Sequence, residues 1–251
     1  MENSIFDKKS RLSDKVLSFL IQLSTFISVG LLIVIIGYIL IRGIPSFNFG
    51  YLVNTTSVLK DTVGILPNII NTVYMIVVTL LIAGPISIGG AIYLNEYATN
   101  KKFVEIISFT TEVLAGIPSI IYGLFGMLFF GNLLKLGYPI LTGALTLAIM
   151  ILPIISRNTQ VALQAVPKSY REAALGIGAT KWYMIRTVLL PSAIPGILTG
   201  IILAMGRIVA ESAALLFTAG SLSMLPRGLF EHLSSSGGTL TIQLYLEMAK
   251  A

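Results

Sequence analysis

The chain has 251 residues, of which 55% are hydrophobic and only 11% are charged. A soluble protein of this length needs more polar surface, so the composition indicates a polytopic membrane protein. Cysteine is absent, which excludes disulfides and thiolate metal sites. We attribute the net charge of +6 to cytoplasmic loops rather than to nucleic-acid binding.

Five apolar runs are each long enough for a transmembrane helix, which needs about 20 apolar residues. The predicted spans are approximately 16–41, 66–94, 113–134, 138–156 (continuing one or two turns) and 192–214. The first run is longer than a signal peptide and has no cleavage site, so an uncleaved helix is expected. Residues 42–64 are expected to form an external loop.

Proline and glycine punctuate the second and third runs. Pro85 and its neighbouring glycines predict a helix buried in a bundle, because the freed carbonyl needs a partner and small residues allow close approach. Gly116 and Pro118 predict a broken or kinked start for the third span. Residues 95–112 are polar with apolar positions at helical spacing, which predicts an amphipathic helix at the inner membrane surface.

Lysine and arginine are distributed unequally between the two sides of this topology. If the N-terminus is inside, the cytoplasmic segments hold roughly twice as many of them as the external segments. The positive-inside rule therefore places residues 1–15 and the segment 157–191 in the cytoplasm. Five spans leave the C-terminus outside.

The segment Glu172–Pro191 reads EAALGIGATKWYMIRTVLLP and separates the fourth and fifth runs. It predicts a short helix over 169–175, broken at Gly176 and Gly178, followed by an amphipathic turn. An ordinary basic loop is the plainer interpretation. The spacing nevertheless resembles the EAA-loop signature of ATP-binding-cassette importer permeases at Glu172, Ala173, Ala174, Gly178 and Pro191.

Two arginines fall in or beside apolar runs, where a charge costs about 2.5–3.5 kcal/mol and normally faces a cavity or a partner. Arg207 is placed near the middle of the fifth span, with Glu211 four residues later on the same helix face. A closed Arg207–Glu211 salt bridge and a role in a transport path are both compatible with this spacing. Arg157 is either an interfacial residue whose guanidinium reaches water or a second contact for an oxyanion.

The block GRIVAESAALLFTAG, together with AGIPSIIYGLFG and GILPNIINT, resembles the A-type permease subunit of phosphate-specific importers. This resemblance implies that Arg157 and Arg207 lie along the substrate path, with Glu211 as the acidic partner of Arg207. Gln160 is expected along the same path; family members often carry glutamate at this position, so no acidic partner for Arg157 is implied there.

The resemblance also implies an all-α, type I permease fold in which six spans are usual. Five are visible, and the chain is expected to be truncated before its last helix. The implied parts are residues 1–65 (tail, first span and external loop) and residues 66–251, the permease core, with its coupling loop at 157–191.

The partners follow from the same resemblance. The chain would form half of a pore in the plasma membrane of a bacterium or archaeon, surrounded by lipid. A second, C-type permease subunit, a dimer of ATP-binding subunits and an external phosphate-binding protein would complete the importer. ATP and Mg²⁺ would act in the ATP-binding subunits, so this chain is expected to be no enzyme and to hold no cofactor.

Several features favour plainer interpretations. His232 is expected in an external loop without ligand partners, so no metal site is predicted. Gly196 and Gly200 have the GxxxG spacing of helix packing, within the bundle or against a sister permease. The sequence leaves two alternatives open: the same machine importing sulfate, molybdate or phosphonate, and a non-transporting membrane scaffold or sensor.

Overall fold

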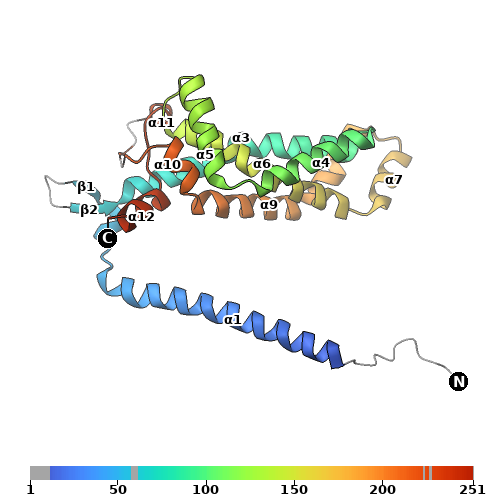
Figure 1. The fold of residues 1–251 in the computed structure, drawn as a ribbon. Coiled ribbons are helices and arrows are strands. Elements are labelled where there is room, and N and C mark those ends of the chain that lie inside the picture. Colours follow the sequence, from blue (N-terminus) through green and yellow to red (C-terminus); the bar gives the residue numbers. More distant parts are fainter. Residues whose placement is uncertain (1–11, 58–61, 223, 226–227, 251) are drawn as a thin grey trace. The chain divides into compact units, whose positions relative to one another are not determined.

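The computed structural model describes residues 12–57, 62–222, 224–225 and 228–250 (Figure 1). Most of the predicted N-terminal tail lies outside these residues. The chain separates into two compact units, Met1–Gly50 and Tyr51–Ala251. The domain boundary predicted at residue 65 remains a prediction.

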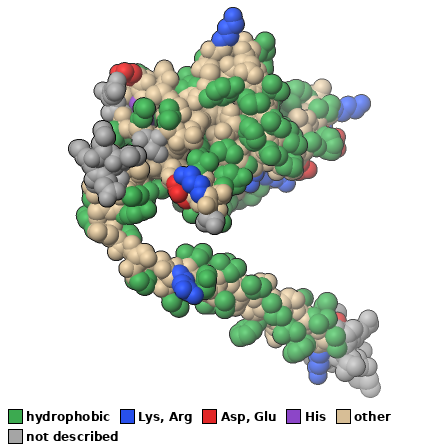
Figure 2. All heavy atoms as spheres, turned by 60° about the vertical axis from the view of Figure 1, so that its left-hand side comes forward, with side chains coloured by type: hydrophobic (Ala, Val, Ile, Leu, Met, Phe, Trp, Pro, Cys, Tyr) green, Lys and Arg blue, Asp and Glu red, His purple; other side chains and the backbone are tan. Residues whose placement is uncertain are grey.

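The first unit is dominated by α1 (Leu12–Gly43), a single uninterrupted helix. Pro45 follows in the short turn η1 (Ile44–Ser46), where a proline is tolerated at a helix start. Apolar side chains occur on every side of α1, and they cover the face seen in Figure 2. A helix that is apolar all round needs lipid or protein around it, which agrees with the predicted first span.

The second unit is a bundle of long helices with smaller elements at one end. The elements from residue 50 onward are α2 (Gly50–Val53), β1 (Thr55–Ser57), β2 (Thr62–Ile65), α3 (Leu66–Ile92), η2 (Tyr93–Tyr97), α4 (Lys101–Gly116), α5 (Ser119–Gly126), η3 (Met127–Leu133), α6 (Ile140–Ala165), α7 (Lys168–Gly176), α8 (Lys181–Met184), η4 (Ile185–Leu189), α9 (Leu190–Ala210), α10 (Ala213–Thr218), α11 (Leu229–Leu233) and α12 (Leu240–Met248). The predicted helical class is confirmed. The antiparallel pair β1–β2 was not predicted.

Within the described part of the chain, four helices are long and apolar enough to cross a membrane: Asp14–Ser46, Leu66–Tyr97, Ile140–Ala165 and Lys181–Ala210. They confirm that the first, second, fourth and fifth predicted spans exist, although the bounds of the fifth differ. A fifth crossing is obtained only if α4 and the segment α5–η3, which meet at an angle of 98°, count as one broken span.

The sequence had predicted a third span that starts at residue 113. In the structure no single helix starts there. Residues up to Gly116 belong to α4, and the chain turns at Ile117 before α5 begins. Ile117 is extended (φ −71°, ψ 131°) because the ring of Pro118 disfavours a helical residue before it. The predicted break is therefore confirmed, whereas the start of the span was wrong.

The fifth predicted span was wrong at both ends. The elements α8, η4 and α9 form one helix from Lys181 to Ala210, so Pro191 lies within it. The π-helical turn η4 ends two residues before Pro191, and a local π-helical turn re-satisfies backbone groups that a proline inside a membrane helix frees. At the other end Glu211 is extended (ψ 124°), and the separate helix α10 follows.

Helix α6 is the central helix of the second unit and packs between α3 and α9. Leu147, Ile151 and Ile155 of α6 lie in the larger apolar cluster with Met75 of α3. A second cluster joins the end of α6 to α7, η4 and α9, and Leu163 is completely buried in it.

Gly196 and Gly200 explain how α9 approaches α6 so closely. A Cβ atom added at Gly196 would lie 2.5 Å from the Cβ of Ala162, and one at Gly200 would lie 2.7 Å from that of Asn158. The GxxxG pair therefore packs within the bundle. Because the numbering rises on α9 as it falls on α6, the two helices are antiparallel.

The second unit has two distinct ends (Figure 1). At the α7 end, α3 and α6 finish and the continuous helix of α8 to α9 begins. At the opposite α12 end, the carbonyl of Gly238 accepts hydrogen bonds from the amides of Asn68 and Asn71 on α3. The amide of Ile140, at the start of α6, donates to Ser235 in the same region.

Candidate functional site

Helix α7 is held away from the axis of α6 by a proline. Val166 is extended (ψ 126°) because it precedes Pro167, which ends α6 and serves as the N-terminal cap of α7. The predicted short helix over 169–175 is confirmed as Lys168–Gly176. Thr180 then accepts a hydrogen bond from the amide of Tyr183 and starts α8.

The glycine of the EAA signature ends α7 through a Schellman motif. The amide of Ala179 donates to the carbonyl of Ala174, and the amide of Gly178 donates to the carbonyl of Leu175. This pattern needs a left-handed residue at Gly178, whose φ is +84°. The EAA signature therefore places its glycine at the one position of the Schellman motif that needs a left-handed backbone, four residues after Ala174.

The residues of α7 divide between a buried and an exposed side. Ala174 is buried in the second apolar cluster. Glu172 and Ala173 are exposed, and Glu172 makes no hydrogen bond or ion pair with other described residues. Ile177, at the tip of the loop, is 85% exposed. Leu175 is also 51% exposed, so α7 and the loop after it leave two large aliphatic side chains uncovered, as an interaction surface does.

A guanidinium that the sequence reasoning overlooked anchors α7. Arg171 Nε and Nη2 donate to Glu96 Oε1 at 3.2 and 3.0 Å, and Arg171 also donates to the carbonyls of Val166 and Leu163. Glu96 belongs to η2, at the end of α3. Nothing in the local spacing relates these residues, since 75 positions separate Arg171 from Glu96.

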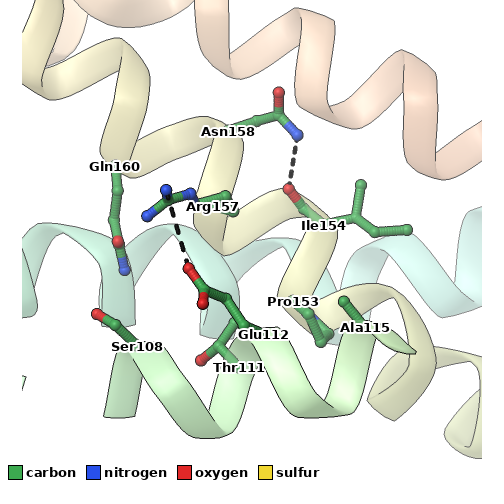
Figure 3. Close-up of a pocket in the computed structure, with 9 residues that line it drawn as sticks. All are labelled: Ser108, Thr111, Glu112, Ala115, Pro153, Ile154, Arg157, Asn158 and Gln160. Carbon is green, nitrogen blue, oxygen red and sulfur yellow. Dashed lines mark hydrogen bonds and ion pairs between the residues drawn. The ribbon is translucent and has the colours of Figure 1, made fainter. Parts of the chain in front are cut away.

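Arg157 lines a cavity of about 240 Å³ between α4 and α6 (Figure 3). Its Nη2 lies 3.9 Å from Glu112 Oε1 of α4, and both side chains remain exposed, at 59% and 64%. Arg157 therefore has an acidic partner after all, supplied by another helix rather than by position 160. The sequence contained no spacing rule that links Glu112 to Arg157.

The remaining lining of this cavity is polar on one side. Gln160 is only 8% exposed, and its side chain turns toward the cavity near Ser108 in Figure 3. Asn158 instead donates to the carbonyl of Ile154 on its own helix. Beside the Glu112 carboxylate, the cavity thus holds a guanidinium, an amide and hydroxyls, which can donate hydrogen bonds to an oxyanion.

The predicted pair of Arg207 and Glu211 is not formed. Arg207 lies in the last turn of α9 and not at mid-span, and Glu211 lies outside the helix. The Glu211 carboxylate accepts a hydrogen bond from the amide of Ala214 at 3.0 Å, which caps α10. Arg207 is exposed, and its positive charge is close enough to act on the hydroxyl of Tyr122 on α5.

The two arginines lie at different depths along the bundle. Gly200 faces Asn158, so Arg157 and Arg207 are offset by six residues along the antiparallel helices α6 and α9. At 1.5 Å per residue the offset is about 9 Å, with Arg207 nearer the α12 end. Two cationic side chains at successive depths can act as successive contacts for one anion.

His232 was predicted in an external loop; it lies in the short helix α11 and is buried, while the side of the membrane stays a prediction. Its side chain is 3% exposed in α11, and Nε2 lies 2.7 Å from Asn71 Oδ1. The amide of Asn71 donates to Gly238, so its oxygen is left to accept from Nε2–H. Burial lowers the pKa of His232 below its ordinary value of 6.5, so the ring is neutral at pH 7. Among the described residues no cluster of three or more metal-ligating side chains occurs.

Comparisons with known proteins agree with this architecture. Residues 86–242 match the family described as "Binding-protein-dependent transport system inner membrane component". The chain is 40% identical over 210 residues to the probable ABC transporter permease protein YqgI of Bacillus subtilis (strain 168), covering 84% of this chain and 71% of that protein. It is 35% identical over 219 residues to the phosphate transport system permease protein PstA of Pasteurella multocida (strain Pm70), covering 87% and 78%.

A solved structure shares the fold. The MetNI methionine ABC transporter, in an inward facing conformation, superposes with a TM-score of 0.50 at 18% identity, covering 74% of this chain and 86% of that chain. These relatives are transport permeases and not enzymes. The chain is therefore a multi-pass membrane protein that belongs to the family of binding-protein-dependent transport system inner membrane components.

Proposed function

We propose that this chain is the A-type permease subunit of an ATP-driven phosphate importer. Its partners would be a C-type permease subunit, a dimer of ATP-binding subunits that use ATP and Mg²⁺, and an external phosphate-binding protein. The N-terminus and α7 would lie in the cytoplasm of a bacterium or archaeon. The observation that carries the proposal is the exposed, capped helix α7, which bears the EAA signature.

The coupling role is supported by the geometry of α7. Glu172 on α7 and Ile177 in the loop after it are exposed and available to the ATP-binding subunit, while Ala174 ties the helix to the bundle. Gly178 ends the helix so that α8 can return toward the membrane. Movement of the ATP-binding subunits would push on α7 and alternate the bundle between inward-open and outward-open states.

The cargo is supported by three observations. Relatives such as the PstA protein of Pasteurella multocida carry phosphate transport in their names. Arg157 and Arg207 offer guanidinium forks, which match tetrahedral oxyanions. Neither is locked in a buried salt bridge among the described residues. The 3.9 Å contact with Glu112 is exposed and therefore weak, so an arriving anion can replace it.

Phosphate uptake by cells carrying Arg207→Gln tests the pathway. A lost charge-assisted hydrogen bond is worth about 1.5–3 kcal/mol, which corresponds to roughly a 10- to 150-fold loss of affinity. We expect a loss of this order while membrane level and association with the ATP-binding subunits stay normal. Arg42→Gln is the matched control, because Arg42 lies in the last turn of α1 in the first unit.

The same cells test the cargo. Sulfate, molybdate and phosphonate uptake are measured beside phosphate, because the name of YqgI specifies no cargo. Normal phosphate uptake in both Arg207→Gln and Arg157→Gln cells would remove the arginines from the path. Loss of sulfate uptake with phosphate uptake intact would assign the machine to another oxyanion.

A further inference from the structure

Arg171 and Glu96 join three structural elements at one point. The Arg171 side chain extends from α7, and its Nε and Nη2 reach Glu96 Oε1 at the end of α3. Its Nη2 and Nη1 also reach the carbonyls of Leu163 and Val166, at 2.8 and 2.9 Å, where α6 ends. One guanidinium therefore holds α3, α6 and α7 together.

This contact differs from an ordinary surface ion pair. The side chain of Arg171 is 20% exposed and that of Glu96 only 7% exposed. The same Glu96 oxygen also accepts from Asn95 Nδ2 at 2.7 Å. Exposed pairs contribute little, whereas a largely buried and multiply bonded pair holds its elements in one arrangement.

The carbonyl contacts have a local cause. Pro167 ends α6 and offers no N–H, so carbonyls in the last turn of α6 lack helical partners. Arginine near a helix C-terminus satisfies such groups. That local role explains the bonds to Leu163 and Val166 but not the bond to Glu96, because capping α6 requires nothing from α3.

A second contact joins the same region to the following helix. Lys181 Nζ lies 5.0 Å from the centre of the Tyr97 ring, next to Glu96 in η2. The end of α3 is thus tied to the start of α8 as well as to α7. Arg171 and Lys181, which lie on either side of Gly178, therefore both contact the five-residue segment η2 (Tyr93–Tyr97).

We propose that Arg171 and Glu96 are positioning residues that transmit the movement of α7 to α3 and α6. The inference rests on the proposed role of α7 as the coupling helix and adds the route by which its displacement enters the bundle. Ala174 packs in the second apolar cluster, which Ile88 and Ile92 of α3 also contact, and the ion pair adds a direct polar link from α7 to the end of α3. Energy passes between sites through such contiguous, rigid contacts. Without the pair, only the less directional apolar packing would link α7 to α3, and α3 would follow α7 less closely.

The test uses the complete importer reconstituted in proteoliposomes, with phosphate transported per ATP hydrolysed as its readout. Arg171→Lys keeps the charge but loses the fork that reaches both Glu96 and the carbonyls. Glu96→Gln keeps an acceptor oxygen and removes only the charge. Glu105→Gln is the matched control, since Glu105 is exposed on α4 and makes no hydrogen bond or ion pair with other described residues.

We expect Arg171→Lys to copurify with the ATP-binding subunits and to hydrolyse ATP, while phosphate transported per ATP falls at least about fivefold, the lower end of typical coupling between sites. Glu96→Gln should show a smaller fall in the same ratio, and Glu105→Gln none. An unchanged ratio in the assembled Arg171→Lys and Glu96→Gln complexes overturns the proposal. So does an equal loss of ATP hydrolysis and transport, which indicates a purely structural role.

The failure of the proposed function gives a different result. If the unaltered chain does not copurify with ATP-binding subunits, the coupling role of α7 is wrong. If the unaltered complex couples ATP hydrolysis to the transport of another oxyanion, the cargo assignment is wrong. The role of the Arg171–Glu96 pair is then tested with that anion as the transported substrate.

Discussion

Replacing Gly196 by alanine tests the contact on which the central bundle depends. The added Cβ would lie 2.5 Å from the Cβ of Ala162 and 3.3 Å from its Cα, whereas an ordinary contact is 3.4–4 Å. Because Ala162 presents a Cβ and its backbone, no rotamer change relieves the clash. Helices α6 and α9 must move apart, and overpacking of this kind costs about 1–3 kcal/mol.

Gly206 on the same helix provides the matched comparison, because a Cβ added there meets nothing within 4 Å. Alanine is favoured over glycine in a helix by about 1 kcal/mol, and this gain is shared by both substitutions. The difference between the variants therefore isolates the packing cost. We expect Gly206→Ala to be more stable than Gly196→Ala by about 1–3 kcal/mol.

The assay is thermal unfolding of the full chain in detergent micelles, followed by circular dichroism. In chains of this size 1 kcal/mol corresponds to about 2–4 °C in Tm. Gly196→Ala should therefore melt measurably below Gly206→Ala. Equal melting temperatures, or a higher one for Gly196→Ala, would refute the close approach of α6 and α9.

Three further predictions concern the loop, the histidine and the cavity. Gly178→Ala forces a left-handed alanine at a cost of about 1–2 kcal/mol and should reduce copurification with ATP-binding subunits. Gly176→Ala is the control and should have no such effect, because Gly176 has no positive φ. Equal effects of the two substitutions would contradict the role of Gly178 in ending α7. Burial lowers the pKa of His232 in the folded chain, so the unfolded chain takes up a proton more readily below about pH 6.5 and stability should fall as the pH drops. His232→Gln should flatten this pH dependence of thermal unfolding between about pH 5 and 8. Glu112→Gln removes an exposed partner, so stability should change by less than about 0.5 kcal/mol. Its KM for phosphate should fall because Arg157 is no longer neutralised, and an unchanged KM would argue against an anion contact there.

The coupling loop was predictable because its structure is local. The left-handed conformation of Gly178, the break before Pro118 and the long apolar helices follow from residues within a few positions of one another. Proline and glycine restrict or free the backbone at their own positions, so sequence reasoning located these features to within a few residues. The continuous helix through Pro191 was missed because the neighbouring π-helical turn has no sequence signature.

The partners of the charged and buried side chains were decided by the tertiary structure. Arg171 meets Glu96 across 75 positions, and His232 meets Asn71 across 161. Glu211 has the spacing of a helical partner for Arg207, yet the chain leaves the helix at that residue and its carboxylate caps α10. The sequence by itself determined which segments are long and apolar enough to cross a membrane and which segment carries the EAA signature, because hydrophobicity and backbone restriction act locally. Only helix packing determined which polar groups meet, because contacts between distant helices depend on their relative depth and rotation.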